Sequence, residues 1–197
     1  TLENCLHWNL IEPMKLFNSA LKAGIKKYII TGTGFEYGQS ALEYERIPVS
    51  ASLKPTLTYA ASKAASSVVF YQWALENDIK LKYLRIFQVF GNGEHLDRLW
   101  PSLKKAAQSG VDFNLSNGEQ VRNFTPVESI VKDLFKALNY FDIENGKPLY
   151  KNLGCQKSQT VKEFAEYWWK KWDAKGKINF GSVPYRKNDV MRFVPEL

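Results

Sequence analysis

Apolar residues near the start of the chain recur at the spacing of an α-helix. Four of them lie three or four positions apart: Leu10, Met14, Phe17 and Leu21. Gly24 follows the last of them, and glycine is common just beyond the end of a helix. We therefore expect an amphipathic helix up to about residue 23, with Pro13 in its first turn or at a kink.

Short β-rich runs alternate with helical patterns in the front half of the chain. Residues 27–31 (KYIIT) and 81–90 (LKYLRIFQVF) have the composition of buried strands, and residues 59–75 return to helical spacing. The stretch between the first strand and this helix contains Pro48 and Pro55 and follows neither pattern. Because strands that alternate with helices form parallel sheets, the fold class is α/β, with helices packed on a sheet.

The pattern changes after Gly91. We expect helices over 99–109 and 126–141, two short strands within 111–124 around Ser116-Asn117-Gly118, a strand over 148–153, and a last helix that begins at Thr160. Thr160 and Glu163 have the spacing of a capping box, which favours a helix start. Three aromatic residues in this helix share one face at spacings of four: Phe164, Trp168 and Trp172. Core packing accounts for them better than a platform for stacking bases.

Composition and charge exclude several classes of protein. With 197 residues, 45% of them hydrophobic and 24% charged, the chain is neither disordered nor fibrous. The net charge of +7 comes from scattered basic residues without a nucleic-acid-binding motif, so no nucleic-acid partner is expected. There is neither an apolar run of about 18 residues nor a signal-peptide pattern, so we expect no membrane association and a cytoplasmic location. Two cysteines and two histidines make a metal site unconvincing, and none is expected.

Three glycines follow the first predicted strand: Gly32, Gly34 and Gly38. Their spacing superficially resembles a dinucleotide-binding fingerprint. A true fingerprint continues directly into a helix whose N-terminus faces the pyrophosphate. Here the chain continues into the proline-containing stretch, so we reject this interpretation.

Tyr59 and Lys63 lie four residues apart in the predicted helix over 59–75, and so share one face. An ammonium group beside a phenol favours its ionised form and lowers its pKa, which would make Tyr59 a usable general acid or base. Tyr167 and Lys171 form a second pair with this spacing, but in the middle of a helix. Tyr59 begins its helix just past the loop that leaves a strand, where ligand sites of α/β proteins gather, so it is the better candidate.

Seven segments occur in the order and spacing of a known family across nearly the whole chain: Asn9, KKYIITGTGFEYG, YAASK (59–63), LRIFQVFG (84–91), GEQVRNF (118–124), NLG (152–154) and PYRKND (184–189). Together they resemble the extended short-chain dehydrogenases/reductases, which comprise nucleotide-sugar epimerases, dehydratases and 4-keto reductases. The sequence segments FEYG and RLWPSLKKAA are most similar to those of bacterial 4-keto-sugar reductases and epimerases of surface-polysaccharide pathways. The resemblance implies a partial Rossmann-like, doubly wound parallel sheet with a smaller C-terminal α/β substrate-binding region.

The resemblance also implies roles for individual residues. Tyr59 matches the catalytic tyrosine, and Lys63 matches the lysine that tunes it and binds the ribose of NAD or NADP. Thr33 matches the catalytic Ser/Thr that hydrogen-bonds the reacting sugar oxygen, and Asn9 resembles an asparagine near the cofactor. The implied chemistry is hydride transfer between a sugar carbon and the nicotinamide, with Tyr59 moving the hydroxyl proton.

The expected partner is a nucleotide-diphosphate sugar. Arg122 and Arg186 match arginines that bind its diphosphate, a task suited to guanidinium groups. Gln88, where many members have Asn, is a further expected substrate contact. Asn123 and Pro126 replace an Asp and a His of the family pattern, which leaves the choice of sugar and nucleotide open.

One departure narrows the reaction. Dehydratases of the family place a Glu two residues before the Tyr-Gly pair, whereas here Phe35 holds that position and Glu36 comes one residue later. A shift of one residue at a strand end turns a side chain to the opposite side, so 4,6-dehydration is disfavoured. A 4-keto reductase and an epimerase remain open, because they share all three catalytic residues. A non-catalytic dinucleotide-binding sensor or scaffold is the alternative, although the intact Thr33, Tyr59 and Lys63 favour an enzyme.

Family members begin with a glycine fingerprint and several strands that this sequence lacks. We therefore expect residues 1–90 to be the C-terminal part of a dinucleotide-binding domain. Residues 91–197 would be mainly a substrate-binding region, with about 125–155 returning to the sheet. The strand at 27–31 should then have an unpaired edge. We expect the chain alone to bind NAD(P) weakly and to be inactive, and the full-length protein to be a homodimer. The residue that selects NAD or NADP would precede Thr1.

Overall fold

The β-rich runs at 27–31 and 81–90 supply adjacent strands of one parallel sheet. This sheet contains β1 (Lys27–Thr33), β2 (Lys80–Ile86) and β7 (Leu149–Leu153), in the order β1-β2-β7. Thr33 lies opposite Ile86, and Ile86 lies opposite Leu153, so the carboxyl ends of the three strands are level. The expected α/β class with a parallel sheet is confirmed in this computed structural model, which describes residues 1–186 and 189–197.

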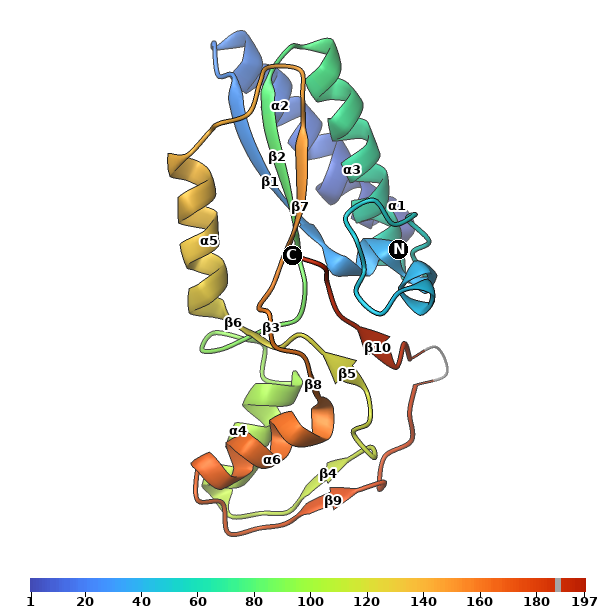
Figure 1. Ribbon diagram of the computed structural model, residues 1–197, viewed down its shortest axis with the longest axis vertical. Helices are drawn as coiled ribbons and strands as arrows, with labels where there is room; N and C mark the ends of the chain where they lie inside the picture. Colours follow the sequence, from blue (N-terminus) through green and yellow to red (C-terminus); the bar gives the residue numbers. More distant parts are fainter. Residues whose placement is uncertain (187–188) are drawn as a thin grey trace.

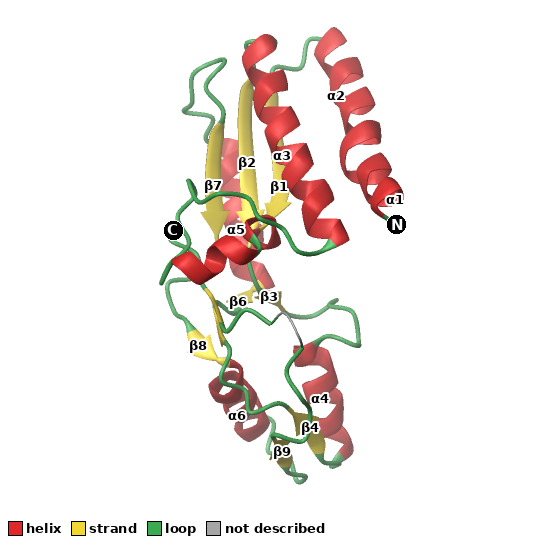
Figure 2. Cartoon of the chain, turned by 90° about the vertical axis from the view of Figure 1, so that its right-hand side faces the viewer, coloured by secondary structure: helices red, strands yellow, loops and turns green. Residues whose placement is uncertain are grey.

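Helices cover both faces of the sheet (Figure 1). The connection from β1 to β2 contains α3 (Thr58–Glu76), which lies beside α2 (Glu12–Lys22) on one face, and α5 (Val127–Asn139) lies on the other face (Figure 2). Alternating strand residues serve the two faces, as the pleat requires. Tyr28 and Ile30 pack with the α2 and α3 side, whereas Ile29 packs with the α5 side.

The expected N-terminal helix is interrupted. It consists of α1 (Leu2–Leu6), a single π-helical turn over His7–Ile11, and α2, whose first turn contains Pro13. The sequence pattern predicted one continuous α-helix, whereas the structure contains a π-helical turn within it. This turn faces α3, because the backbone carbonyl of Asn9 accepts a hydrogen bond from the Ser66 hydroxyl at 2.7 Å.

β1 lies at an edge of the sheet. Within the part of the chain that the structure describes, β1 pairs with β2 alone, so one side of its backbone has no strand partner. The expected open edge is therefore present.

A smaller lobe lies below the sheet in Figure 1 and contains α4 and α6. Its elements are β3 (Val89–Phe90), α4 (Leu99–Ser109), β4 (Phe113–Leu115), β5 (Val121–Arg122), β6 (Thr125–Pro126), β8 (Gln159–Thr160), α6 (Val161–Lys171), β9 (Ile178–Phe180) and β10 (Arg192–Phe193). Two residues of the segment PYRKND, Lys187 and Asn188, lie outside the described residues.

The two strands expected within 111–124 both exist, but they do not pair with each other. β4 pairs with β9 in parallel, and β5 pairs with β8 and β10. The run expected over 81–90 is likewise two strands, since the chain leaves the main sheet after Ile86 and β3 pairs with β6 in the lower part of the molecule. The Ser116-Asn117-Gly118 turn therefore joins two different sheets.

The capping box and the aromatic core of α6 are confirmed. The Thr160 hydroxyl accepts a hydrogen bond from the Glu163 amide at 3.0 Å, and the Glu163 carboxylate accepts one from the Thr160 amide at 2.7 Å. Phe164 is buried and stacks on Phe124 at 3.9 Å between ring centroids. Trp168 and Trp172 are partly buried and pack against the same cluster, which joins α6 to α4.

Two further observations concern membrane-spanning helices and metal sites. None of the helices in residues 1–186 and 189–197 is both long and apolar enough to cross a membrane. The same residues contain no group of three or more His, Cys, Asp or Glu side chains arranged to hold a metal ion.

The aromatic cluster of the lower lobe predicts a large stability difference between two neighbours on α6. We expect Phe164→Ala to lower the free energy of unfolding by about 3–5 kcal/mol, because it leaves a cavity among stacked rings. Tyr167 is 57% exposed, so Tyr167→Ala should cost less than about 1 kcal/mol. Urea unfolding of the two variants measures this difference in the free energy of unfolding. An equal loss in both variants would contradict the assignment of the Phe164 ring to a buried core.

Candidate active site

The carboxyl end of β1 carries the first candidate residue. Thr33 is buried and is the N-cap of a short 3-10 helix, Gly34–Tyr37 (η2 in chain order), where its hydroxyl oxygen accepts a hydrogen bond from the Phe35 amide at 3.3 Å. The Glu36 carboxylate accepts a hydrogen bond from the Thr33 amide at 2.9 Å. These reciprocal bonds form a capping box, which fixes the turn that follows the strand.

Tyr59 and Lys63 lie one turn apart at the start of α3, as predicted, and α3 packs against both β1 and the turn after it. The Lys63 ammonium donates a hydrogen bond to the Thr31 carbonyl at 2.6 Å. Tyr59 is 48% exposed, so its phenol is accessible from solvent. The structure therefore brings Tyr59 and Lys63 to the strand end that carries Thr33.

The electrostatics of this pair differ from the sequence-based expectation. Burial, assisted by the negative charge of Glu36, raises the pKa of the Tyr59 phenol. Burial lowers the pKa of the Lys63 ammonium, and Glu36 opposes that shift. The expected lowering of the tyrosine pKa by the ammonium is absent, because the hydrogen bond described for Lys63 goes to the Thr31 carbonyl and not to the phenol.

Asn9 lies in the π turn that faces the start of α3. Its side-chain amide donates a hydrogen bond to the Ser62 hydroxyl at 2.9 Å, and that hydroxyl in turn donates to the Tyr59 carbonyl at 2.8 Å. Asn9 is thus two hydrogen bonds from the backbone of Tyr59. The structure brings this predicted cofactor residue to the first turns of α3.

Arg122 and Arg186 line one cavity of about 350 Å³ between the turn after β1 and the lower lobe. Phe35 lines the same cavity and stacks on Phe193 at 5.6 Å. Arg122 forms an ion pair with Asp189 at 3.0 Å. The cavity therefore combines an aromatic wall with two guanidinium groups, a donor set suited to a phosphate-bearing ligand.

Gln88 is not among the residues that line this cavity. It lies just before β3 and is partly buried, and its backbone carbonyl accepts a hydrogen bond from the Thr125 amide at 2.9 Å. The structure therefore brings only some of the predicted substrate residues together. Arg122 and Arg186 line one cavity, whereas Gln88 is not among its lining residues.

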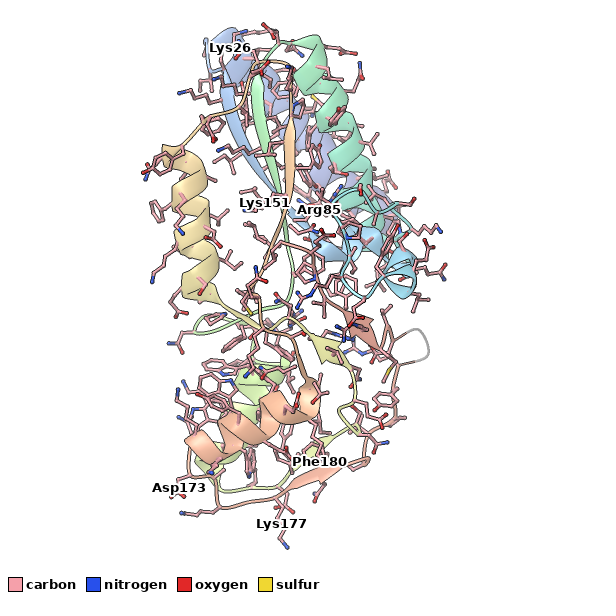
Figure 3. All side chains as sticks on the ribbon, viewed as in Figure 1. Lys26, Arg85, Lys151, Asp173, Lys177 and Phe180 are labelled. Carbon is pink, nitrogen blue, oxygen red and sulfur yellow. The ribbon has the colours of Figure 1, made fainter. Side chains whose placement is uncertain are left out.

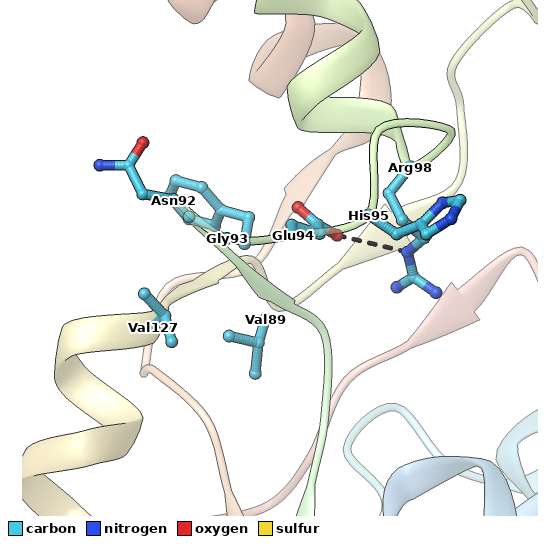
Figure 4. A pocket seen from close by; sticks show the side chains of 9 residues that line it. Val89, Asn92, Gly93, Glu94, His95, Arg98 and Val127 are labelled. Atoms are coloured by element: carbon cyan, nitrogen blue, oxygen red, sulfur yellow. Dashed lines mark hydrogen bonds and ion pairs between the residues drawn. The ribbon is translucent and has the colours of Figure 1, made fainter.

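A second cavity, of about 440 Å³, lies beside the loop that follows β3 (Figure 4). Glu94 and Arg98 form an ion pair at 3.3 Å there, and Val127 at the start of α5 closes one side. None of the predicted site residues lines this cavity, so it belongs to a different part of the molecule.

Sequence reasoning treated Glu36 only as a poor substitute for a dehydratase glutamate. In the structure its carboxylate is fully buried and pairs with the guanidinium of Arg85 on β2 at 2.8 Å. Arg85 is labelled near the lower end of the sheet in Figure 3. The spacing of Thr33 and Glu36 is that of a capping box, so this contact could be predicted from the sequence. The partner Arg85 is 49 residues away, so no local sequence pattern indicates the ion pair.

Comparisons with known proteins agree with this architecture. The profile described as "NAD dependent epimerase/dehydratase family" matches residues 2–150. UDP-glucose 4-epimerase of Rhizobium meliloti is 24% identical over 205 residues, which cover 94% of this chain and 60% of that protein. The chain spans somewhat more than half the length of the curated relatives that it matches over nearly all of its own length.

Solved structures share the fold. UDP-N-acetylglucosamine 4-epimerase from Methanobrevibacter ruminantium M1, in complex with UDP-N-acetylmuramic acid, superposes with a TM-score of 0.85 at 21% identity and covers 97% of this chain and 60% of its own. MoeE5, in complex with UDP-glucuronic acid and NAD, has a TM-score of 0.80 at 20% identity, with 96% and 62% covered. Other matching structures hold NAD or NADPH.

Proposed function

Because this chain belongs to the NAD dependent epimerase/dehydratase family, we propose that it carries the hydride-transfer site of a nucleotide-sugar oxidoreductase, a 4-keto reductase or an epimerase. The observation that supports this most is the convergence of Thr33, Tyr59 and Lys63 at the carboxyl end of β1. In open α/β sheets, ligands bind beyond the carboxyl ends of the strands.

The residues at this end of the sheet fit a nicotinamide cofactor. An accessible phenol and an ammonium one turn apart suit the hydroxyl groups of a ribose, and Asn9 lies beside the same turn. Tyr59, Lys63 and Asn9 are the residues that would hold NAD or NADP. When bound, the cofactor supplies or accepts the hydride.

The chain's own residues handle the proton and the sugar oxygen. Tyr59 keeps its proton at neutral pH, because burial and Glu36 raise its pKa, so it is poised to give that proton to a keto oxygen. The Thr33 hydroxyl accepts from the Phe35 amide, which leaves its own proton to donate to the same oxygen. Lys63 is anchored at Thr31 and retains two further donor protons for Tyr59 or a ribose.

Phe35 and Glu36 support reduction or epimerisation over 4,6-dehydration. The Phe35 ring is partly exposed in the arginine-lined cavity and offers no proton-transferring group. Glu36 is the nearest carboxylate in sequence, but it is fully buried and paired with Arg85. An acid or base for removing water is therefore missing from the position where the dehydratases have one.

The activity test uses the full-length protein and NAD(P)H absorbance, with nucleotide 4-keto sugars and, separately, nucleotide sugars that carry a 4-hydroxyl group. A reductase oxidises one NAD(P)H for each keto group that it reduces, and an epimerase inverts the 4-hydroxyl group with no net change in NAD(P)H. Tyr59→Phe should lower turnover by about 100-fold or more and weaken cofactor binding by calorimetry only slightly, because it removes the transferable proton and leaves Lys63 and Asn9 in place. Retained turnover in this variant would sink the assignment.

We propose that Arg122 and Arg186 bind the diphosphate of the substrate. Each charge-assisted bond is worth roughly 1.5–3 kcal/mol, so Arg186→Met should weaken binding of a nucleotide diphosphate sugar by about 10- to 100-fold. Arg122→Lys keeps the charge beside Asp189 and should also weaken binding, because the planar fork is lost.

Arg98→Met is the matched control for this pair, since Arg98 pairs with Glu94 in the other cavity. Calorimetry with UDP and CDP sugars measures all three variants. Equal losses in the control and in the two test variants would contradict a diphosphate role.

We propose that the protein forms a homodimer through the outer face of α3 and the adjoining π turn. Val68 is 62% exposed and Trp8 is 69% exposed, and both are apolar. Figure 2 places α1, α2 and α3 side by side along one flank of the molecule. Among the described residues these apolar side chains are left exposed; such a surface marks an interaction site, and a self-complementary partner for it is a second copy.

Light scattering after size exclusion tests the dimer. The protein should elute at twice the mass of one chain, and Val68→Asp should shift it to one mass. Leu42→Asp, at a residue that is 71% exposed outside this face, should leave the dimer intact. A monomeric parent protein would contradict the proposal.

A further inference from the structure

A buried ion pair lies directly behind the candidate active site. Glu36 is fully buried and Arg85 is 4% exposed, and their side chains meet at 2.8 Å. Moving two charges from water into a protein interior is costly and is tolerated only when hydrogen bonds satisfy both groups. Replacement by apolar residues of similar volume is often neutral or stabilising. The pair is therefore weak evidence for a role in stability and invites another explanation.

Each oxygen of the Glu36 carboxylate has described partners. Oε1 accepts from the Thr33 amide and from the Tyr83 hydroxyl, each at 2.9 Å, and Oε2 accepts from Arg85 Nε. The Tyr83 hydroxyl also lies 3.2 Å from the Lys63 carbonyl oxygen. The carboxylate thus contacts the Thr33 backbone directly and lies one phenol group from the backbone of Lys63.

The main chain of β1 makes room for this arrangement at Gly32. A Cβ atom at that position would lie 2.2 Å from the Tyr83 ring and 2.5 Å from Glu36 Oε1. Only glycine permits the carboxylate and the phenol to approach the strand this closely.

We propose that Glu36 is a positioning residue of the active site, which fixes Thr33 at the end of β1 and, through Tyr83, the first turns of α3 that carry Tyr59 and Lys63. The proposal rests on the proposed function, because it assigns Glu36 to the same site. Glu36 touches neither substrate nor cofactor, since it is fully buried. It acts through the residues that do.

The charge of Glu36 provides a measurable signature of this arrangement. The titratable groups whose charges act on the Tyr59 phenol are Glu36 from the turn after β1 and Cys5 from α1, whereas the Lys63 ammonium, one turn along α3, donates to the Thr31 carbonyl. Glu36 raises the pKa of Tyr59 and opposes the lowering of the pKa of Lys63. Removing the negative charge should therefore lower both pKa values, whereas removing an uncharged group from the same network should leave them unchanged.

The test is an NMR titration of the chain with ¹³C-labelled tyrosine, with the Tyr59 signal assigned by Tyr59→Phe. Glu36→Gln keeps the size and one oxygen acceptor but removes the charge, so the pKa of Tyr59 should fall. Tyr37→Phe is the matched control, because it removes a hydroxyl that Arg85 donates to in the same network without changing a charge. The pKa of Tyr59 should be unchanged in this control.

A second variant covers the case in which Glu36→Gln alone does not fold. Glu36→Leu with Arg85→Met removes the pair together and fills similar volume, which buried ion pairs commonly tolerate. In this variant the pKa of Tyr59 should fall, and the Thr33 amide should lose its bond, shift its resonance and exchange faster with solvent. An unchanged Tyr59 titration and an unchanged Thr33 amide in a folded variant would overturn the proposal.

Activity separates this proposal from the proposed function. In the full-length protein, Glu36→Gln should lower kcat by about 10- to 100-fold with KM little changed, because small misplacements of reacting groups have effects of that size. An unchanged kcat would overturn the positioning role in an enzyme of proven activity. A parent protein without hydride-transfer activity would overturn the proposed function, whereas the NMR result would still decide the role of Glu36 in the site geometry.

Discussion

The Glu36–Arg85 ion pair is the centre of the buried hydrogen-bond network that links the carboxyl ends of the sheet strands. Glu36 follows β1, Arg85 is on β2, and the Arg85 guanidinium donates to the Tyr37 hydroxyl at 3.0 Å. Tyr37 donates in turn to the side chain of Asn152 on β7 at 2.7 Å. One connected set of buried polar groups therefore joins the carboxyl ends of all three strands of the sheet. Because a buried charge without its partner is costly, each member constrains the positions of the others.

The same hydrogen-bond network includes two further segments that lie near the candidate active site. The Asn152 amide donates to the carbonyls of Ile47 and Glu196, which belong to the long loop after β1 and to the C-terminal segment. That segment includes β10, whose Phe193 stacks on Phe35 in the arginine-lined cavity. The turn that carries Thr33 and the C-terminal segment that lines the arginine-lined cavity are thus both tied to one buried polar network.

Local sequence signals predicted elements whose causes are local. The helix expected over 99–109 has those limits in the structure, and the capping box of α6 formed as expected, since both depend on residues within a few positions of one another. The interruption at His7–Ile11 was not predicted, because its contacts with Ser62 and Ser66 come from a different helix. β4 was expected near β5, but it pairs with β9, 65 residues away. A local turn sequence cannot indicate a pairing between strands so far apart in the chain.

The same distinction holds for the site. Thr33, Tyr59 and Lys63 were found through motifs, and the structure adds that Lys63 donates to the Thr31 carbonyl at the end of β1. Glu36 was underestimated, because its partners Tyr83 and Arg85 are 47 and 49 residues away in sequence. Its burial depends on the pairing of β2 with β1, which brings those two partners beside it.

We propose that hydride transfer to a sugar carbon takes place at the carboxyl end of β1. The most direct test of this proposal is to load the full-length protein with NAD(P)H that carries deuterium at both C4 positions of the nicotinamide and add a nucleotide 4-keto sugar. Mass spectrometry of the product should find one deuterium on the sugar, for a reductase and an epimerase alike, and Tyr59→Phe should abolish its incorporation. A product sugar without deuterium, formed by protein that has bound the labelled cofactor, would contradict the account.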